Sequence, residues 1–232
     1  MDKILPIKIA AQPDDTTCGP TSLHAIYDFY QDPITLKKVI KDIDQHADGG
    51  GTFAVVLGRH ALSRGYKATV YSYNINVFDP SWFGLEKKDL IAKLKLRYDK
   101  RKGVKLKAAI KEYIKFLKAG GEIRFDDLSP ELVADILAKD TPILTGLSST
   151  WLYQSMRENS VSNKNDDIGG DPAGHFVIVN GLQDDIISVA DPYLKNPISN
   201  DHFYKIDINR FINAILLGIT SYDGNLLIIE RK

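Results

Sequence analysis

The chain has 232 residues, of which 44% are hydrophobic, and this is enough for one sizeable core of an ordinary globular protein. Thirty basic and thirty acidic side chains cancel, so the net charge implies no partner of either sign. A single cysteine excludes an intrachain disulfide and a multi-cysteine zinc site, and it favours a reducing compartment such as the cytoplasm. No apolar run reaches the roughly 18 residues of a membrane span, and the first residues lack the apolar core of a signal peptide.

The N-terminal stretch predicts a thiol at the start of a helix. Residues 4–11 alternate loosely and predict a short strand or extended segment. The two residues after Cys18 are Gly19 and Pro20, and they predict a turn that leads into a helix, because Pro suits a first helical position. Apolar residues then recur at helical spacing as far as Tyr30. The unpaired N–H groups and the dipole at a helix start favour a thiolate, the nucleophilic form of cysteine.

Gln12 lies six residues before the cysteine. Its side-chain amide and the backbone N–H of Cys18 could together hold a developing oxyanion. The competing interpretation of Cys18 is a small buried apolar side chain, which is what most lone cysteines are. A catalytic role also needs a base, and the N-terminal stretch does not supply one.

Helical spacing and alternation predict the elements that follow. Thr35 and Thr52 are the expected caps of two helices, and Gly65 is expected to end the second. Gly49, Gly50 and Gly51 predict a turn before it. The expected elements are helices at 35–43 and 52–64, a strand at 67–73, and two helices within 86–118.

The segment 86–118 is crowded with lysine and has two interpretations. It could be a basic surface for a nucleic acid, an acidic peptide or a membrane. It could instead be a solvated pair of helices whose long side chains cover apolar neighbours. The second interpretation is favoured, because the rest of the chain must then be net acidic. We therefore expect no nucleic-acid partner, and a protein partner at this segment stays open.

The last hundred residues predict more strands than helices. Ser129 and Pro130 form a typical helix start, with a cap followed by a first-position proline. The polar stretch 159–171 predicts a loop and is the first candidate for a lid over a cleft. The other expected elements are helices at 129–139, within 148–159 and at 209–217, and strands at 141–147, 175–179, 186–190, 203–208 and 226–229.

His175 begins one predicted strand, and Asp191 ends the next. The short turn between the strands predicts a hairpin, and an antiparallel pair places the start of one strand beside the end of the other. His175 and Asp191 are therefore expected to lie close together. A lone histidine or an Asp-Pro turn is usually structural. Together with Cys18 and Gln12, however, they supply the base, the orienting group, the nucleophile and the oxyanion donor of a cysteine hydrolase.

These motifs resemble a known family. The matching parts are Gln12, the run Cys18-Gly19-Pro20-Thr21-Ser22-Leu23, the run Ala-Gly-His-Phe-Val-Ile-Val-Asn-Gly at 173–181, and Asp191-Pro192. They are similar to the motifs of the C39 and C39-like peptidases, which belong to the papain-like cysteine peptidase superfamily. The resemblance implies an α+β, papain-like fold, in which a helical half carrying Cys18 packs on an antiparallel β-sheet carrying His175 and Asp191. It also implies a single domain over 1–232, with the lysine-rich helices as an insertion at about 86–120.

The resemblance also implies roles for the four residues. Cys18 would be the nucleophile, His175 the general base and acid, and Asp191 the group that orients the imidazole, while Gln12 would complete the oxyanion hole. The expected activity is that of a soluble thiol hydrolase that cleaves a peptide or other amide bond through a thioester, with no cofactor and no metal.

This chain also departs from the family. Thr17 stands where many members carry an acid before the cysteine, and this difference does not affect any of the four catalytic roles. The leader peptides cut by transporter-fused members do not carry over, because this chain has no transporter part.

Two alternatives use the same residues or the same fold. An acyltransferase would pass the acyl group from Cys18 to an amine instead of water. A non-catalytic module would use the fold only to bind a peptide, although such a role needs none of the four residues. Neither the substrate nor the oligomeric state is predicted by the sequence.

Overall fold

The computed structural model of the protein describes residues 3–43, 51–159, 162 and 164–232. Eight strands form one sheet in the order β3-β2-β8-β4-β5-β6-β7, and β1 pairs with β5 beside this path. Neighbouring strands are antiparallel except β2 and β3, which run parallel. The strands are β1 (Lys3–Ile4), β2 (Lys67–Ser72), β3 (Glu122–Arg124), β4 (Ile143–Ser148), β5 (Gly174–Gln183), β6 (Ile186–Ala190), β7 (Phe203–Asp207) and β8 (Asn225–Glu230).

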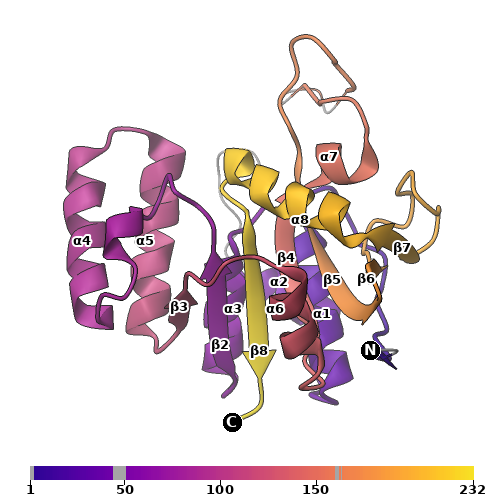
Figure 1. Cartoon of the computed structure of the whole chain (residues 1–232), viewed down its shortest axis with the longest axis horizontal. Coiled ribbons are helices and arrows are strands. Elements are labelled where there is room, and N and C mark those ends of the chain that lie inside the picture. Colours follow the sequence, from indigo (N-terminus) through magenta and orange to yellow (C-terminus); the bar gives the residue numbers. More distant parts are fainter. Residues whose placement is uncertain (1–2, 44–50, 160–161, 163) are drawn as a thin grey trace.

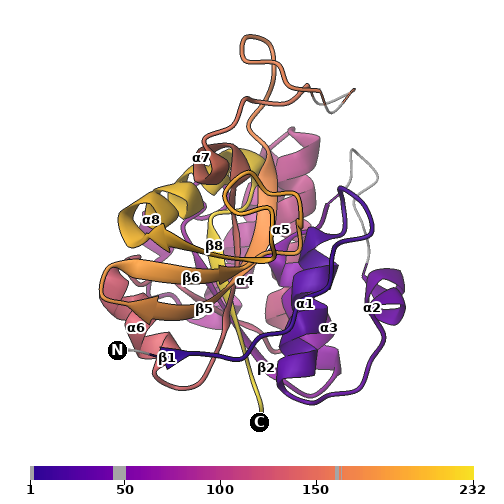
Figure 2. The same cartoon turned by 90° about the vertical axis from the view of Figure 1, so that its right-hand side faces the viewer.

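Helices cover both faces of the sheet. Helices α1 and α3 lie on one face and α6 and α8 on the other (Figure 2), while α4 and α5 stand beside the β2–β3 edge (Figure 1). No helix in the described ranges is both long and apolar enough to span a membrane. The helices are α1 (Cys18–Phe29), α2 (Leu36–Asp42), α3 (Ala54–Ser63), α4 (Lys87–Lys100), α5 (Val104–Lys118), α6 (Pro130–Leu137), α7 (Ser149–Tyr153) and α8 (Ile208–Leu217), with short 3₁₀ turns at Pro80–Trp82 and Gly218–Ser221.

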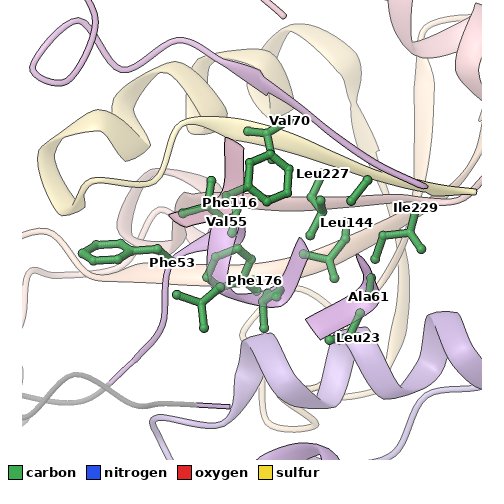
Figure 3. Close-up of a cluster of buried hydrophobic side chains, with 14 of the residues drawn as sticks. Leu23, Phe53, Val55, Ala61, Val70, Phe116, Leu144, Phe176, Leu227 and Ile229 are labelled. Carbon is green, nitrogen blue, oxygen red and sulfur yellow. The ribbon is translucent and has the colours of Figure 1, made fainter. Parts of the chain in front are cut away.

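Strand β5 is buried on both faces and separates two hydrophobic cores. Phe176 and Ile178 enter the core beneath α1 and α3, whereas Val177 and Val179 enter the core beneath α6 and α8. A strand covered on both faces needs such an unbroken apolar run. Figure 3 shows the first core, where Phe116 of α5 also packs with side chains of the sheet.

Most predicted elements are present, with shifts at their ends. Thr35 caps α2 by accepting from the Lys38 N–H, and Ser129 caps α6 in the same way. The expected cap Thr52 is wrong: α3 begins at Ala54 after Phe53, and no side chain of the described residues caps it. The predicted end of the strand at Asn180-Gly181 is also wrong. Gly49 and Gly50 lie outside the described residues.

Strand β5 continues past Asn180, and the N-terminal segment forms two hydrogen bonds with this residue. Its side-chain Nδ2 donates to the Leu5 carbonyl at 2.9 Å, and its own carbonyl accepts from the Leu5 N–H. The strand then passes through an irregularity in register between Val179 and Gly181 and runs to Gln183. Of the extended segment expected at 4–11, only β1 is assigned as strand.

Gly19, the second residue of α1, marks the closest approach of α1 to its neighbours. A Cβ at this position would lie 2.8 Å from Thr52 Cγ2 and 3.3 Å from a ring carbon of Phe176. We expect Gly19→Ala to lower the free energy of unfolding in urea by about 1–3 kcal/mol, because the added methyl overpacks this contact. Gly103→Ala is the control, since its Cβ would meet nothing nearer than 3.8 Å. Equal stability of the two variants would contradict the prediction.

Candidate active site

Cys18 is the first residue of α1, and its side chain is 7% exposed. Thr17 precedes the helix, but its hydroxyl donates to the Asp14 carbonyl at 3.1 Å and does not cap the first turn. The first N–H groups of a helix lack partners within it. They therefore face the same end of the helix as the sulfur. Ser22, one turn later, ties α1 to β5 by donating to the Phe176 carbonyl at 3.3 Å.

The β5–β6 hairpin brings His175 and Asp191 into direct contact. His175 Nε2 lies 2.8 Å from Asp191 Oδ1, and both residues are buried. The bond to Asp191 uses Nε2 and leaves the other ring nitrogen, Nδ1, and Cys18 is near enough to the imidazole to contribute to its raised pKa. Cys18 on α1 and His175 on β5 therefore meet at one end of the sheet.

Two tyrosines that the sequence did not single out complete the surroundings of Asp191. Tyr153 on α7 donates to Asp191 Oδ2 at 2.6 Å, and Tyr204 on β7 donates to the same oxygen at 2.8 Å. The Tyr193 N–H donates to Oδ1 at 2.8 Å. The fully buried carboxylate thus accepts four hydrogen bonds, counting His175, as burial of a charge requires.

The charges of His175 and Asp191 stabilise each other. Burial disfavours an imidazolium, but Asp191 and Cys18 outweigh it and raise the pKa of His175 to about 10. Burial alone would raise the pKa of Asp191, yet His175, Tyr153 and the Tyr193 N–H lower it below its ordinary value. Burial raises the pKa of the Tyr153 and Tyr204 phenols well above 10, so both remain donors. The favoured state is an imidazolium beside a carboxylate.

This pair predicts how stability depends on pH. A histidine with a raised pKa stabilises the fold fully below its unfolded value, near ~6.5, and this contribution is lost as pH rises toward 10. We expect the free energy of unfolding to fall as pH rises toward 10, with a slope of up to about 1.4 kcal/mol per pH unit, the value for one extra proton bound by the folded state. The full slope applies above ~8.5, where the thiol of the unfolded chain is also ionised, because below it a thiolate–imidazolium pair binds no more protons than the two unfolded side chains. His175→Gln should flatten that slope in urea titrations at several pH values. An unchanged slope would show that another group is responsible.

Gln12 lies beside the site, and both its backbone and its side chain form hydrogen bonds there. Its backbone N–H donates to the Pro192 carbonyl at 2.9 Å, which ties the segment before α1 to the residue after Asp191. Its side-chain Nε2 donates to the Asp14 carbonyl at 2.8 Å. One of the two amide hydrogens is thus committed to the turn that leads into Cys18.

A cavity of about 690 Å³ opens over these residues. Gln12, Cys18, Tyr153 and His175 all line it. Its other walls come from four regions: the segment before α3 with the start of α5, the loop between α7 and β5, the loop between β6 and β7, and the turn before β8. They contribute Thr52, Phe53, Lys105 and Ala108, then Glu158 and Asn165, then Tyr193 and Lys195, and finally Asp223.

The loop expected to act as a lid contributes to this cavity from one side. Glu158 forms bridges with Asn165 and Asp171, so the described residues on either side double back as an arm, which we define as residues 154–159, 162 and 164–173. The arm rises beyond α7 in both views (Figures 1 and 2). Residues 160, 161 and 163 lie outside the described residues. The lid role of the stretch 159–171 stays a prediction.

Comparisons with known proteins concern the fold. Neither a family model nor a curated protein sequence matches the chain. The arrangement of the sheet and its helices is similar to that of a solved C39-like peptidase, and the predicted α+β fold class is confirmed.

The solved structure that carries this likeness is described as a C39-like peptidase from Bacillus anthracis. It has a TM-score of 0.50 and 12% identity, and the alignment covers 100% of this chain and 98% of that one. The peptidase domain of Streptococcus ComA also matches, with a TM-score of 0.45, 13% identity, and coverage of 97% and 99%. A double-glycine-motif protease from an AMS/PCAT transporter, solved with its leader peptide, has a TM-score of 0.45, 16% identity, and coverage of 99% and 95%.

Proposed function

We propose that the protein is a cysteine hydrolase of the peptidase or amidase type. The observation that supports this best is the buried His175–Asp191 pair at 2.8 Å, in a site where His175 and Cys18 line the same cavity of about 690 Å³. Burying a charged pair costs desolvation free energy. Four donors to Asp191 and a histidine pKa raised to about 10 are therefore more typical of a functional site than of a purely structural one. A catalytic thiol must stay reduced, so we also propose that the protein acts in the cytoplasm.

In the proposed reaction, Cys18 Sγ attacks the carbonyl carbon of the scissile amide. The C=O π-bond opens, and the oxyanion is held by the Cys18 N–H and by the second amide hydrogen of Gln12. His175 then gives its proton to the leaving nitrogen as the C–N bond breaks, and a thioester remains on Cys18. Water attacks the thioester while His175 takes a proton from it, and the acid product leaves the free thiolate. Asp191 holds the imidazole in position and stays ionised throughout.

An activated ester tests this proposal without knowledge of the natural substrate. p-Nitrophenyl acetate should release a burst of one p-nitrophenolate per chain as Cys18 is acylated, followed by slower turnover as the thioester hydrolyses. The burst should vanish in Cys18→Ala and fall strongly in His175→Ala. Absence of a Cys18-dependent burst in the wild-type chain would refute the hydrolase proposal and leave the peptide-binding alternative.

The same assay separates hydrolysis from acyl transfer. A primary amine added at increasing concentration would capture the acetyl group as an amide if the cavity admits amines in place of water. Hydrolysis predicts acetate as the main product at moderate amine concentration. A peptide library incubated with wild-type protein and with Cys18→Ala would then show whether peptide bonds are cleaved and at which sequences.

A further inference from the structure

The lysine-rich helices carry a large net positive charge, which the rest of the chain balances with an equal negative charge. Residues 86–118 contain thirteen Lys and Arg against four Asp and Glu, a net charge of +9, so the remaining 17 basic and 26 acidic side chains carry −9. Of these thirteen basic side chains, within the described part of the chain, Lys115 alone lies within 4.0 Å of a carboxylate, that of Glu112. Most of the positive charge of these helices is therefore not paired with a carboxylate of the described residues.

Part of this charge forms a stripe along α5. Lys107, Lys111, Lys115 and Lys118 follow one another at spacings of four, four and three residues, which places them on one side of the helix. Lys111 and Lys118 are exposed, and Lys107 lies 4.2 Å above the Tyr98 ring. At 1.5 Å per residue the stripe is about 16 Å long, the length of about five residues of extended polypeptide.

The stripe lies beside the candidate active site. Ala108, in the second turn of α5, lines the same cavity as Cys18 and His175, and it lies three residues before Lys111 on the same side of the helix. Lys105 also lines the cavity, but it lies two residues before Lys107 and therefore faces another side of the helix. Helix α5 is held there because it packs on α3 and contributes Phe116 to the first core. A polypeptide that left the cavity along α5 would therefore pass from Ala108 onto the stripe.

The walls of the cavity carry charges of both signs, whereas the stripe is positive. Its walls include the acids Asp15, Glu158 and Asp223 beside the bases Lys105 and Lys195. An acidic residue next to the reacting bond would meet like charges there, whereas the same residue several positions away would lie on α5. The favoured substrate would be neutral at the cleaved bond and acidic further along the chain.

We propose that the α5 stripe is an exosite for an acidic stretch of a polypeptide substrate whose neutral portion occupies the cavity. The inference rests on the proposed function, because it assigns the occupant of the same cavity. A single-stranded nucleic acid fits less well. Bases stack on exposed aromatic rings, and within 86–118 Tyr113 and Phe116 are buried while Tyr98 is half-buried beneath Lys107.

An affinity label tests the exosite on the full chain. The probe is a peptide with an N-terminal iodoacetyl group, a short glycine linker and six glutamates, and its partner carries glutamine in place of glutamate. A second pair carries the iodoacetyl group on a C-terminal lysine. Cys18 is the only thiol, so each peptide can form one thioether and release one iodide. We expect an acidic probe to label Cys18 about tenfold faster than its neutral partner at low salt, and this advantage to shrink at high salt.

Matched variants locate the effect. Reversing three stripe charges with Lys107→Glu, Lys111→Glu and Lys118→Glu should abolish the advantage of the acidic probe. The control Lys8→Glu, Lys41→Glu and Lys205→Glu makes the same change in net charge on exposed residues elsewhere and should preserve it. Loss of the advantage in both variants would mean that overall charge, not the stripe, attracts the probe, and would overturn the proposal.

Three other outcomes would also overturn the exosite. The first is an acidic probe that labels no faster than the neutral one. The second is oligodeoxythymidine competing with the acidic probe more strongly than oligoglutamate of equal charge, which would assign the stripe to nucleic acid. The third is self-association that the stripe variant abolishes, which would assign it to a second copy of the chain. Iodoacetamide labelling separates these failures from failure of the proposed function, because it reports the reactivity of Cys18 without using α5.

Discussion

Replacing His175 by alanine is expected to slow the alkylation of Cys18 by iodoacetamide about 100-fold at pH 6. In the wild-type chain, the imidazolium of His175 lies beside Cys18, and Asp191 helps to raise the histidine pKa to about 10. This positive charge is present throughout the neutral range. A neighbouring positive charge favours a thiolate, which is the reactive form of a thiol, so its loss is expected to slow alkylation.

The measurement is the alkylation rate as a function of pH, with circular dichroism to show that the variant is folded. His24→Ala is the matched control, because it removes a histidine whose ring Nε2 bonds to the Ile34 carbonyl away from the cavity. The control should keep the wild-type profile. A His175→Ala protein that is alkylated at the wild-type rate at pH 6 would show that no thiolate–imidazolium pair is assembled.

Asp191→Asn is expected to leave the fold largely intact but to slow Cys18 alkylation at neutral pH by tenfold or more. The carboxylate is fully buried, and it offsets the burial that otherwise disfavours a charged His175. A neutral amide cannot do this, so the imidazole loses its proton at neutral pH and no longer stabilises a thiolate. The Tyr153 and Tyr204 hydroxyls can rotate and accept from an amide, which limits the structural cost.

Two variants separate charge from structure in this prediction. Asp191→Ala leaves both phenols without their acceptor and should cost about 1–3 kcal/mol of stability for each unsatisfied group. Asp135→Asn makes the same chemical change as Asp191→Asn at an exposed position on α6 and should change neither stability nor alkylation. If Asp191→Asn kept the wild-type pH profile, the carboxylate would not be the group that holds His175 charged.

Local patterns predicted much of the fold and the positions of the candidate site residues. Helical spacing behind Gly19 and Pro20 placed Cys18 at a helix start, where α1 does begin. The hairpin signal placed His175 beside Asp191, and the two side chains are 2.8 Å apart. Both inferences rest on contacts between residues that are near one another in the sequence or joined by a short turn.

Features that depend on distant packing could not be predicted in the same way. Tyr204 reaches Asp191 because β7 pairs with β6, and Tyr153 reaches it on α7, which packs on α8. Lys105 enters the cavity only because α5 packs on α3. Strand β3 pairs parallel with β2 after two intervening helices, and its three residues carry no pattern of their own. No local spacing encodes any of these contacts.

The hydrogen bond between Ser22 and Phe176 spans 154 residues of sequence. It joins the helix that carries the thiol to the strand that carries its proposed base, so neither segment can form the site alone. During synthesis, α1 leaves the ribosome long before β5 exists, because translation proceeds at about 5–20 residues per second. For that interval the nascent chain holds a cysteine without a histidine partner. Because of this order of synthesis, the proposed activity would begin only when the C-terminal half has folded onto the first.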